Sequence, residues 1–317
     1  IDCLKGLPDQ LNEVDIDGKT PLHLAINKGQ TDIAIKLVEC LKATPDQLNI
    51  SNKSGRTPLH YAINYRQTGI TLKLIDCLKA SPEQLNVVDK VGNTPLHYAI
   101  HNGQKNITIK LVEYLKASPD LLNVANNYGL TPLHLVIKNG QFGLASNLIK
   151  SLQEVSLEQP NLEDENGNTP LHYAIHKGQR DIALELIDCL KATPDLLNIL
   201  NKSGRTPLHF AIFREQTDIT LELIGCLKEF PDQLNVKDSN GDTSLHLAIK
   251  YGQTPVAMEL INILPAEQLN QMLLALKTNE EIKAALHEKL SQQERLSLFS
   301  GGSNSANEKT SSNKRNP

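Results

Sequence analysis

One four-residue motif recurs along this chain at an almost constant spacing. Thr-Pro-Leu-His begins at Thr20, Thr57, Thr94, Thr131, Thr169 and Thr206, and a seventh copy reads Thr-Ser-Leu-His from Thr243. Successive copies are 37 residues apart, apart from one interval of 38. A repeat of this size is one supersecondary unit that cannot bury its apolar face alone, so neighbouring units must stack. The sequence therefore predicts a solenoid, and its function must lie on a surface.

Three further positions keep the same register. In the first repeat Asn12, Asp15 and Gly18 lie eight, five and two residues before the motif Thr, and every later repeat has an Asn, an Asp or Asn, and a Gly at these places. This Asn-x-x-Asp/Asn-x-x-Gly-x-Thr-Pro-Leu-His frame resembles the ankyrin repeat over residues 12 to about 264. One copy could arise by chance, whereas seven copies in register could not.

The chemistry of the frame agrees with that resemblance. An Asp or Asn followed by Gly favours a turn, because the short side chain caps its own backbone and Gly accepts a positive φ. Thr followed by Pro favours a helix start, with the hydroxyl as N-cap. We expect a finger, then a helix over about residues 21–28, then a second helix over about residues 32–42 with Ile33, Leu37, Val38 and Leu41 on one stripe at helical spacing.

The chain departs from the ankyrin pattern by an extra segment after the second helix. Ankyrin units usually have about 33 residues, but here Ala43-Thr44-Pro45-Asp46-Gln47-Leu48-Asn49 follows, and similar segments recur in later repeats. A Ser or Thr, then Pro, then an acid predicts one more capped helical turn. Around residue 150 this pattern loosens and carries the one-residue insertion.

The two ends define the expected domain organisation. Residues 1–12 align with residues 75–86, so they form a partial preceding repeat, and the missing Met suggests a fragment. Residues 13–270 form the repeat array, residues 271–299 two closing helices, and residues 300–317, rich in Gly, Ser, Asn and Lys, a disordered tail. The expected fold class is all-α: an ankyrin-repeat solenoid closed by C-terminal helices.

Composition excludes several classes of function. No apolar run reaches the ~18 residues of a membrane span, and the net charge of −4 is modest. The five cysteines occupy one repeat position, so they lie about 10 Å apart in a stack, which is too far for disulfides. Five unpaired thiols favour a reducing compartment. The sequence also lacks a phosphate-binding loop and a His-Glu-x-x-His motif. We therefore expect no metal, no cofactor, no small-molecule substrate and no catalytic activity.

The resemblance implies where a partner would bind. In ankyrin proteins the finger tips and the exposed end of the first helix form the concave binding side, and the motif imidazole forms hydrogen bonds within and between fingers. Carried over to this sequence, the expected partner-binding residues are Lys19, Lys28, Lys53, Arg56, Tyr65, Lys90, His101, Tyr128, Lys138, His176, Lys177, Lys202, Arg205, Phe213, Arg214, Lys250 and Tyr251.

The charge of that concave set is the strongest functional signal. Over all finger-tip and helix-end positions there are eleven Lys or Arg and three acids, Asp17, Glu165 and Asp242, a charge of +8 in a chain whose net charge is −4. We expect a non-catalytic scaffold, located in the cytoplasm, that binds a protein with an acidic patch. The alternative is the substrate-targeting region of a larger enzyme or of a secreted bacterial effector that acts in a host cytosol. Nucleic-acid binding is less favoured, because few aromatic residues interleave the lysines.

Overall fold

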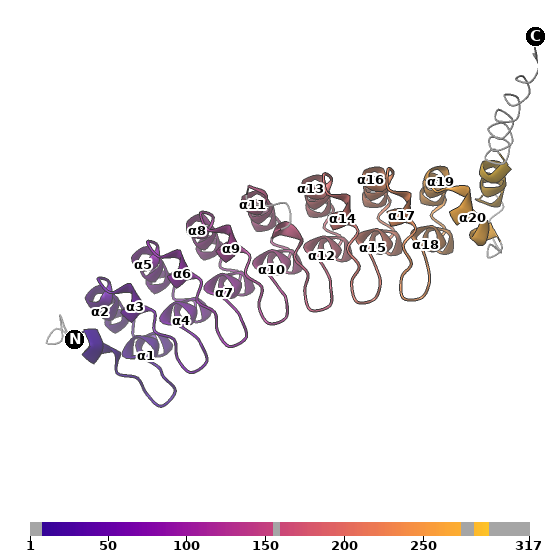
Figure 1. The fold of residues 1–317 in the computed structure, drawn as a ribbon. Coiled ribbons are helices and arrows are strands. Elements are labelled where there is room, and N and C mark those ends of the chain that lie inside the picture. Colours follow the sequence, from indigo (N-terminus) through magenta and orange to yellow (C-terminus); the bar gives the residue numbers. More distant parts are fainter. Residues whose placement is uncertain (1–7, 155–158, 274–281, 292–317) are drawn as a thin grey trace, which may run out of the picture. The chain divides into compact units, whose positions relative to one another are not determined.

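The computed structural model describes residues 8–154, 159–273 and 282–291, and the chain divides into two compact units. Unit 1 comprises Ile1–Lys202 and unit 2 comprises Ser203–Pro317. Within each unit the repeats stack as layers, and Figure 1 shows each layer as a finger followed by two antiparallel helices. The described residues form helices and contain no strand beyond one isolated bridge, between Lys237 and Thr243.

Each layer of unit 1 has a first and a second helix. The first helices are α1 (Pro21–Asn27), α4 (Pro58–Asn64), α7 (Pro95–His101), α10 (Pro132–Lys138) and α12 (Pro170–His176). The second helices are α2 (Thr31–Leu41), α5 (Thr68–Leu78), α8 (Lys105–Leu115), α11 (Phe142–Gln153) and α13 (Arg180–Leu190). Each first helix packs on its own second helix, and α1, α4, α7 and α10 each also pack on the first helix of the next layer of unit 1.

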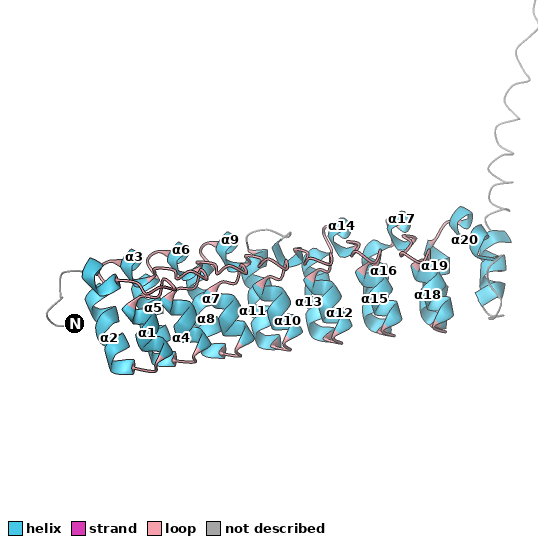
Figure 2. Cartoon of the chain, turned by 90° about the horizontal axis from the view of Figure 1, so that it is seen from below, coloured by secondary structure: helices cyan, strands magenta, loops and turns pink. Residues whose placement is uncertain are grey.

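The extra segment forms a third, short helix. In unit 1 these helices are α3 (Pro45–Leu48), α6 (Pro82–Leu85), α9 (Pro119–Leu122) and α14 (Pro194–Leu197), and Figure 2 shows α3, α6 and α9 along one edge of the stack. The 3₁₀ turns η2 (Pro8–Asn12) and η3 (Gln159–Asn161) take its place before the first layer and after α11. The predicted capping is wrong, because the Thr44 hydroxyl donates to the carbonyl of Leu41 instead of capping α3.

Unit 2 repeats the same plan. Its first helices are α15 (Pro207–Phe213) and α18 (Ser244–Lys250), its second helices α16 (Thr217–Leu227) and α19 (Thr254–Ile263), and its short helix α17 (Pro231–Leu234). Then follow α20 (Ala266–Leu273) and a helix over residues 282–291. α20 begins at Ala266, five residues before residue 271, where the two closing helices were expected to begin. Residues 1–7, 274–281 and 292–317, where the other terminal predictions fall, lie outside the described residues.

The motif Thr and His explain why every first helix begins where it does. Thr20 Oγ1 accepts a hydrogen bond from the His23 N–H at 3.4 Å, and the Thr20 N–H donates to His23 Nδ1 at 3.1 Å. Each bond of this reciprocal pair satisfies one backbone N–H group at the start of the helix. The same pair of bonds recurs at every first helix. The remaining ring nitrogen, His23 Nε2, lies 2.9 Å from the Arg56 carbonyl of the next finger. The expected bond to the next finger is confirmed for His23, His60, His97 and His134, whereas Nε2 of His209 is buried without a hydrogen-bond partner.

Hydrogen bonds between layers hold the fingers side by side. The Lys53 N–H donates to the Asp17 carbonyl at 2.9 Å, and equivalent backbone bonds join each later finger of unit 1 to the one before it. This close approach requires glycine: a Cβ on Gly129, whose φ is 71°, would lie 2.7 Å from the backbone of Asp164. The fingers of unit 1 thus form a continuous, rigid edge.

The core of unit 1 is a strip of Leu, Ile, Val and Ala between the helices. In α2 the buried side chains are Ala34, Leu37, Val38 and Leu41, whereas Ile33 is 41% exposed. The equivalents of Ile33 in later repeats, such as Ile70, are buried, so the first layer differs from the others at this position. In the part of the chain that the structure describes, no helix is both long and apolar enough to cross a bilayer.

Candidate functional site: a groove between fingers and first helices

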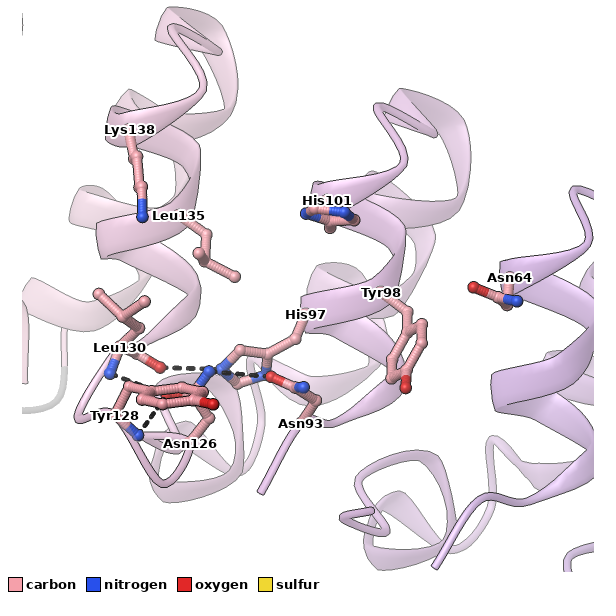
Figure 3. Close-up of a pocket in the computed structure, with 10 residues that line it drawn as sticks. All are labelled: Asn64, Asn93, His97, Tyr98, His101, Asn126, Tyr128, Leu130, Leu135 and Lys138. Atoms are coloured by element: carbon pink, nitrogen blue, oxygen red, sulfur yellow. Dashed lines mark hydrogen bonds between the residues drawn. The ribbon is translucent and has the colours of Figure 1, made fainter. Parts of the chain in front are cut away.

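A groove of about 400 Å³ lies in unit 1 between the fingers and the first helices (Figure 3). Three kinds of element line it: the ends of first helices, the body of first helices, and finger residues. The lining residues are Asn64, His101 and Lys138 at the helix ends, His97, Tyr98 and Leu135 in the helices, and Asn93, Asn126, Tyr128 and Leu130 in the fingers. We call this surface the groove. Its lining contains no carboxylate.

The acidic residue nearest the groove is turned inward. Asp89 is buried, and its carboxylate accepts hydrogen bonds from the Tyr98 hydroxyl at 2.8 Å and from the Val91 and Asn93 N–H groups at 2.9 Å each. Burial alone would raise the pKa of Asp89, but these hydrogen bonds hold that pKa below its usual value. Burial and the adjacent carboxylate raise the pKa of Tyr98. The Asp89 carboxylate therefore links the finger to α7 through its hydrogen bonds and is not available to a partner.

The motif histidine that lines the groove, His97, forms hydrogen bonds within the chain through both ring nitrogens. His97 Nδ1 accepts from the Thr94 N–H at 3.2 Å, and Nε2 lies 3.0 Å from the Leu130 carbonyl, to which it donates. Burial lowers the pKa of His97 to about 4. A proton on Nδ1 would face the Thr94 N–H, so the ring stays neutral at pH 7 and fixes the next finger.

Two carboxamides give the finger side of the groove a fixed shape. Asn126 Oδ1 accepts from the Tyr128 N–H at 3.0 Å and the Leu130 N–H at 3.1 Å, while Asn126 Nδ2 donates to Asn93 Oδ1 at 2.9 Å. The Tyr128 ring is 50% exposed beside them. The groove therefore offers amide groups, an exposed phenol ring and the cationic side chain of Lys138 on a preorganised backbone.

Most predicted partner-binding residues of unit 1 are exposed, and the groove brings three of them together. His101, Tyr128 and Lys138 line it directly. The other predicted side chains of unit 1 that are exposed are Lys28, Lys53, Tyr65, Lys90, His176, Lys177 and Lys202. These seven do not line the groove.

In unit 2, four predicted partner-binding residues form a cluster of aromatic rings and guanidinium groups: Arg205, Phe213, Arg214 and Tyr251. Phe213 is 42% exposed, and its ring packs edge-on against Tyr251 with centroids 5.6 Å apart. The guanidinium groups of Arg205 and Arg214 lie 5.5 and 5.9 Å from the centroid of the Phe213 ring. Lys250 is exposed and lies 3.5 Å from Asp242.

Three of the predicted partner-binding cations form ion pairs with carboxylates of the same chain. Arg56 is half-buried, with Nε 3.6 Å from the buried carboxylate of Asp89 and its guanidinium over the Tyr98 ring at 5.4 Å. Arg205 similarly lies 3.5 Å from Asp238, and Lys19 lies 2.8 Å from Asp17. The Arg56 and Arg205 pairs join neighbouring fingers, whereas Lys19 and Asp17 belong to one finger.

The sequence analysis missed the helix body as a lining element. Tyr98 and Leu135 occupy the position just after the motif His, which is Leu, Tyr or Phe in every repeat. In a helix this position lies on the same face as the helix-end residue three places later, so Tyr98 and His101 share one face. That spacing was a usable signal. The resemblance drew attention only to the helix ends.

The fold and the repeats agree with comparisons to known proteins. The profile of the family described as ankyrin repeats (3 copies) matches residues 1–84, 70–157, 108–198, 142–232 and 185–272. The chain belongs to the ankyrin-repeat family. Ankyrin repeats generally mediate protein–protein interactions, and the fold is typically a non-catalytic scaffold.

Two solved structures illustrate the shared fold. The ankyrin repeat domain of Bcl-3, a member of the IkappaB family, is 23% identical, with a TM-score of 0.52, 75% of this chain covered and 99% of that one. An ankyrin repeat protein from Leishmania major is 20% identical, with a TM-score of 0.57, 87% of this chain covered and 96% of that one. No curated protein matches the sequence. At these identities the likeness concerns the fold alone.

Proposed function

We propose that this protein is a non-catalytic scaffold whose groove in unit 1 binds an acidic segment of a partner protein. The observation that carries the proposal is the composition of the groove, which combines Lys138 with amide and phenol groups and contains no carboxylate. A partner carboxylate in this place would find hydrogen-bond donors and a cation, and would meet no like charge.

The charges around the groove also favour an acidic partner. Lys53 and Lys90 are exposed on the fingers. The carboxylate of Asp89, also on a finger, accepts hydrogen bonds from groups of the same chain. Exposed cations around a preformed groove speed association with acidic partners, and this effect weakens as salt screens the charges.

Exposed aromatic residues supply the apolar part of the contact. Tyr128 is 50% exposed in the groove, and Tyr65 is 46% exposed at the end of α4. Tyrosine is enriched among residues that contribute most to protein interfaces, because its ring buries a large area and its hydroxyl still finds a partner. The preferred target is therefore an acidic segment that also carries apolar side chains.

The test uses selection from a random peptide display library on the full chain. We expect enrichment of Asp and Glu next to apolar residues, and affinity that falls as ionic strength rises. A variant with Lys90→Glu and Lys138→Glu should bind the selected peptides about tenfold more weakly or worse. Thermal stability should change little, because both side chains are exposed.

The matched control changes two lysines that lie neither in the groove nor on the fingers. Lys42→Glu and Lys116→Glu alter the net charge by the same amount, at exposed positions just after α2 and α8. If the control weakened binding as much as the groove variant, net charge alone would explain the effect. Selection of neutral or basic peptides would also contradict the proposal.

A further inference from the structure

Helix α16 of unit 2 is almost a copy of α5 of unit 1, but its outward surface differs. Each helix has 11 residues, and all positions but three carry the same residue, including every buried one. The three differences, none of them at a buried position, replace Gly69, Lys73 and Asp76 of α5 by Asp218, Glu222 and Gly225 of α16. The buried residues are therefore kept, while the charge of the outward surface changes from zero to −2.

In α5 the outward charges are paired with the neighbouring layers of unit 1. Lys73 lies 2.5 Å from Glu39 on α2, and Asp76 lies 3.1 Å from Lys110 on α8. The equivalent pairs cannot form in unit 2, because α16 has an acid and a glycine at these two positions.

The next second helix, α19, continues the outward surface of α16. The two helices pack against each other, and Figure 1 shows both on the side away from the fingers. Neither helix contains Lys or Arg, so the charged residues on this side are Asp218, Glu222 and Glu259. We call the outward side of α16 and α19 the acidic face. Leu221 is 39% exposed on it, and Met258, one layer further on, is half-buried.

Two carboxylates of the acidic face, those of Glu222 and Glu259, form no ion pair with any residue that the structure describes. The acidic face therefore leaves carboxylates available to a partner. The cations near the ends of the two helices are Arg214 and Lys228, each followed directly by an acid, Lys250, which lies 3.5 Å from Asp242, and Lys289, which donates to the carbonyl of Asn262.

Gly225 has no packing role inside the chain. It is exposed in the middle of α16, and a Cβ at this position would meet no side chain and no other segment within 4 Å. Glycine within a helix lowers stability, whereas it allows another backbone to approach closely. Because Leu221 lies one turn earlier on the same side of α16, such an approach would cover its exposed side chain. The other six repeats have a longer side chain at this position: Glu39, Asp76, Glu113, Lys150, Asp188 and Asn262.

We propose that the acidic face binds a basic amphipathic helix of another protein. The apolar stripe of that helix covers Leu221 and Met258, its backbone passes over Gly225, and its Lys or Arg side chains pair with Glu222 and Glu259. A second copy of this chain that presented the same face would bring like charges together, which opposes binding. The acidic face belongs to unit 2 and the groove to unit 1, so the proposal does not rest on the proposed function.

The size of the acidic face indicates a weak complex. A helix of 11 residues such as α16 is about 16 Å long, and its neighbour lies roughly 10 Å away. This footprint is smaller than that of a standard protein interface. We therefore expect rapid exchange and an affinity that falls as salt screens the charges.

The test uses a synthetic helical peptide of about 18 residues with Leu along one stripe and Lys elsewhere. A second peptide has Glu in place of Lys, and a third has the composition of the first in scrambled order. Binding to the full chain is measured by fluorescence anisotropy. The first peptide should bind at least about tenfold more tightly than either of the others, because only it combines positive charge with an apolar stripe.

Three variants locate the binding. Glu222→Lys with Glu259→Lys should weaken binding of the first peptide at least about tenfold. The matched control, Glu83→Lys with Asp120→Lys, makes the same change of net charge at exposed positions on α6 and α9 and should bind within about twofold of the wild type. Gly225→Gln should raise the midpoint of thermal unfolding, because Gln is the better helix former, yet weaken binding at least about fivefold by blocking the approach.

The opposite directions of the two Gly225→Gln effects separate a lost contact from a lost fold, and circular dichroism checks the charge variants. A wild-type chain that does not bind the first peptide at about 100 μM would overturn the proposal. Equal binding of the scrambled peptide would do so too, as would a control variant that binds as weakly as the acidic-face variant. Sedimentation equilibrium is run alongside, and a wild-type dimer abolished by Glu222→Lys with Glu259→Lys would assign the face to a second copy and refute the proposed partner.

Discussion

The motif histidines should make unit 1 markedly less stable in mild acid. Burial lowers the pKa values of His23, His60, His97 and His134 to about 4 each. The usual value in an unfolded chain is about 6.5. Between these two values the unfolded state binds protons and the folded state does not. Stability is therefore fully present above about pH 6.5 and is lost as the pH falls from there towards 4.

The size of the effect follows from the two pKa values. At pH 5.5 one such histidine favours the unfolded state by about 1.4 kcal/mol relative to neutral pH. Four of them give about 5 kcal/mol, a large part of a typical unfolding free energy. The buried carboxylates act in another window. The pKa values of Asp89 and Asp164 are lowered, so their contribution is present above their unfolded pKa, near 4, and is lost only below it.

The measurement is urea unfolding of the full chain at pH 7.5, 6.5 and 5.5, followed by circular dichroism. The unfolding free energy should fall steeply over the last interval. A His97→Gln variant should be less stable at pH 7.5 but should lose about a quarter less stability on acidification, since one of the four rings is absent. A free energy that differs by less than about 1 kcal/mol between pH 7.5 and 5.5 would refute the reasoning, because at least one of these rings would then have to be protonated in the fold.

Three further outcomes are expected. Arg66 has φ 56° where most repeats have Gly, so Arg66→Gly should stabilise unit 1 by about 0.5–1 kcal/mol in thermal unfolding, while Arg66→Ala should not. Gly129→Ala should cost more than about 2 kcal/mol, because its Cβ would overlap the next finger, whereas Gly140→Ala, with φ 69° and open space around it, should cost only about 1 kcal/mol. Urea midpoints distinguish the two, and equal costs would contradict the close-approach argument. Replacement of all five cysteines by Ala should leave circular dichroism unchanged, with the largest loss from buried Cys189, and a bound zinc ion lost on replacement would contradict this.

Much of the fold was predictable because its signals are local. Thr before Pro fixes a helix start within one turn, and Gly at a positive φ fixes the finger, whatever the neighbours are. The 37-residue spacing then requires stacking. The prediction was wrong where two hydrogen-bond partners compete for the same side chain. The hydroxyl of Thr44 has both a helix start and the preceding helix end within reach, and it binds the Leu41 carbonyl of the latter.

In the candidate site, too, some features follow from the local sequence and others depend on neighbouring layers. The sequence by itself determined that the fingers and the helix ends are rich in Lys, Arg and aromatic residues, since their positions follow from the repeat register. Only the tertiary structure decided which of these cations are exposed and which pair with groups of the same chain. Lys53 and Arg56 are three residues apart on one finger, yet Lys53 is exposed and Arg56 lies against Asp89 and Tyr98 of the next repeat. The reason is physical: whether a surface charge is available depends on an opposite charge or ring within about 4 to 6 Å, and such a neighbour belongs to another layer of the stack.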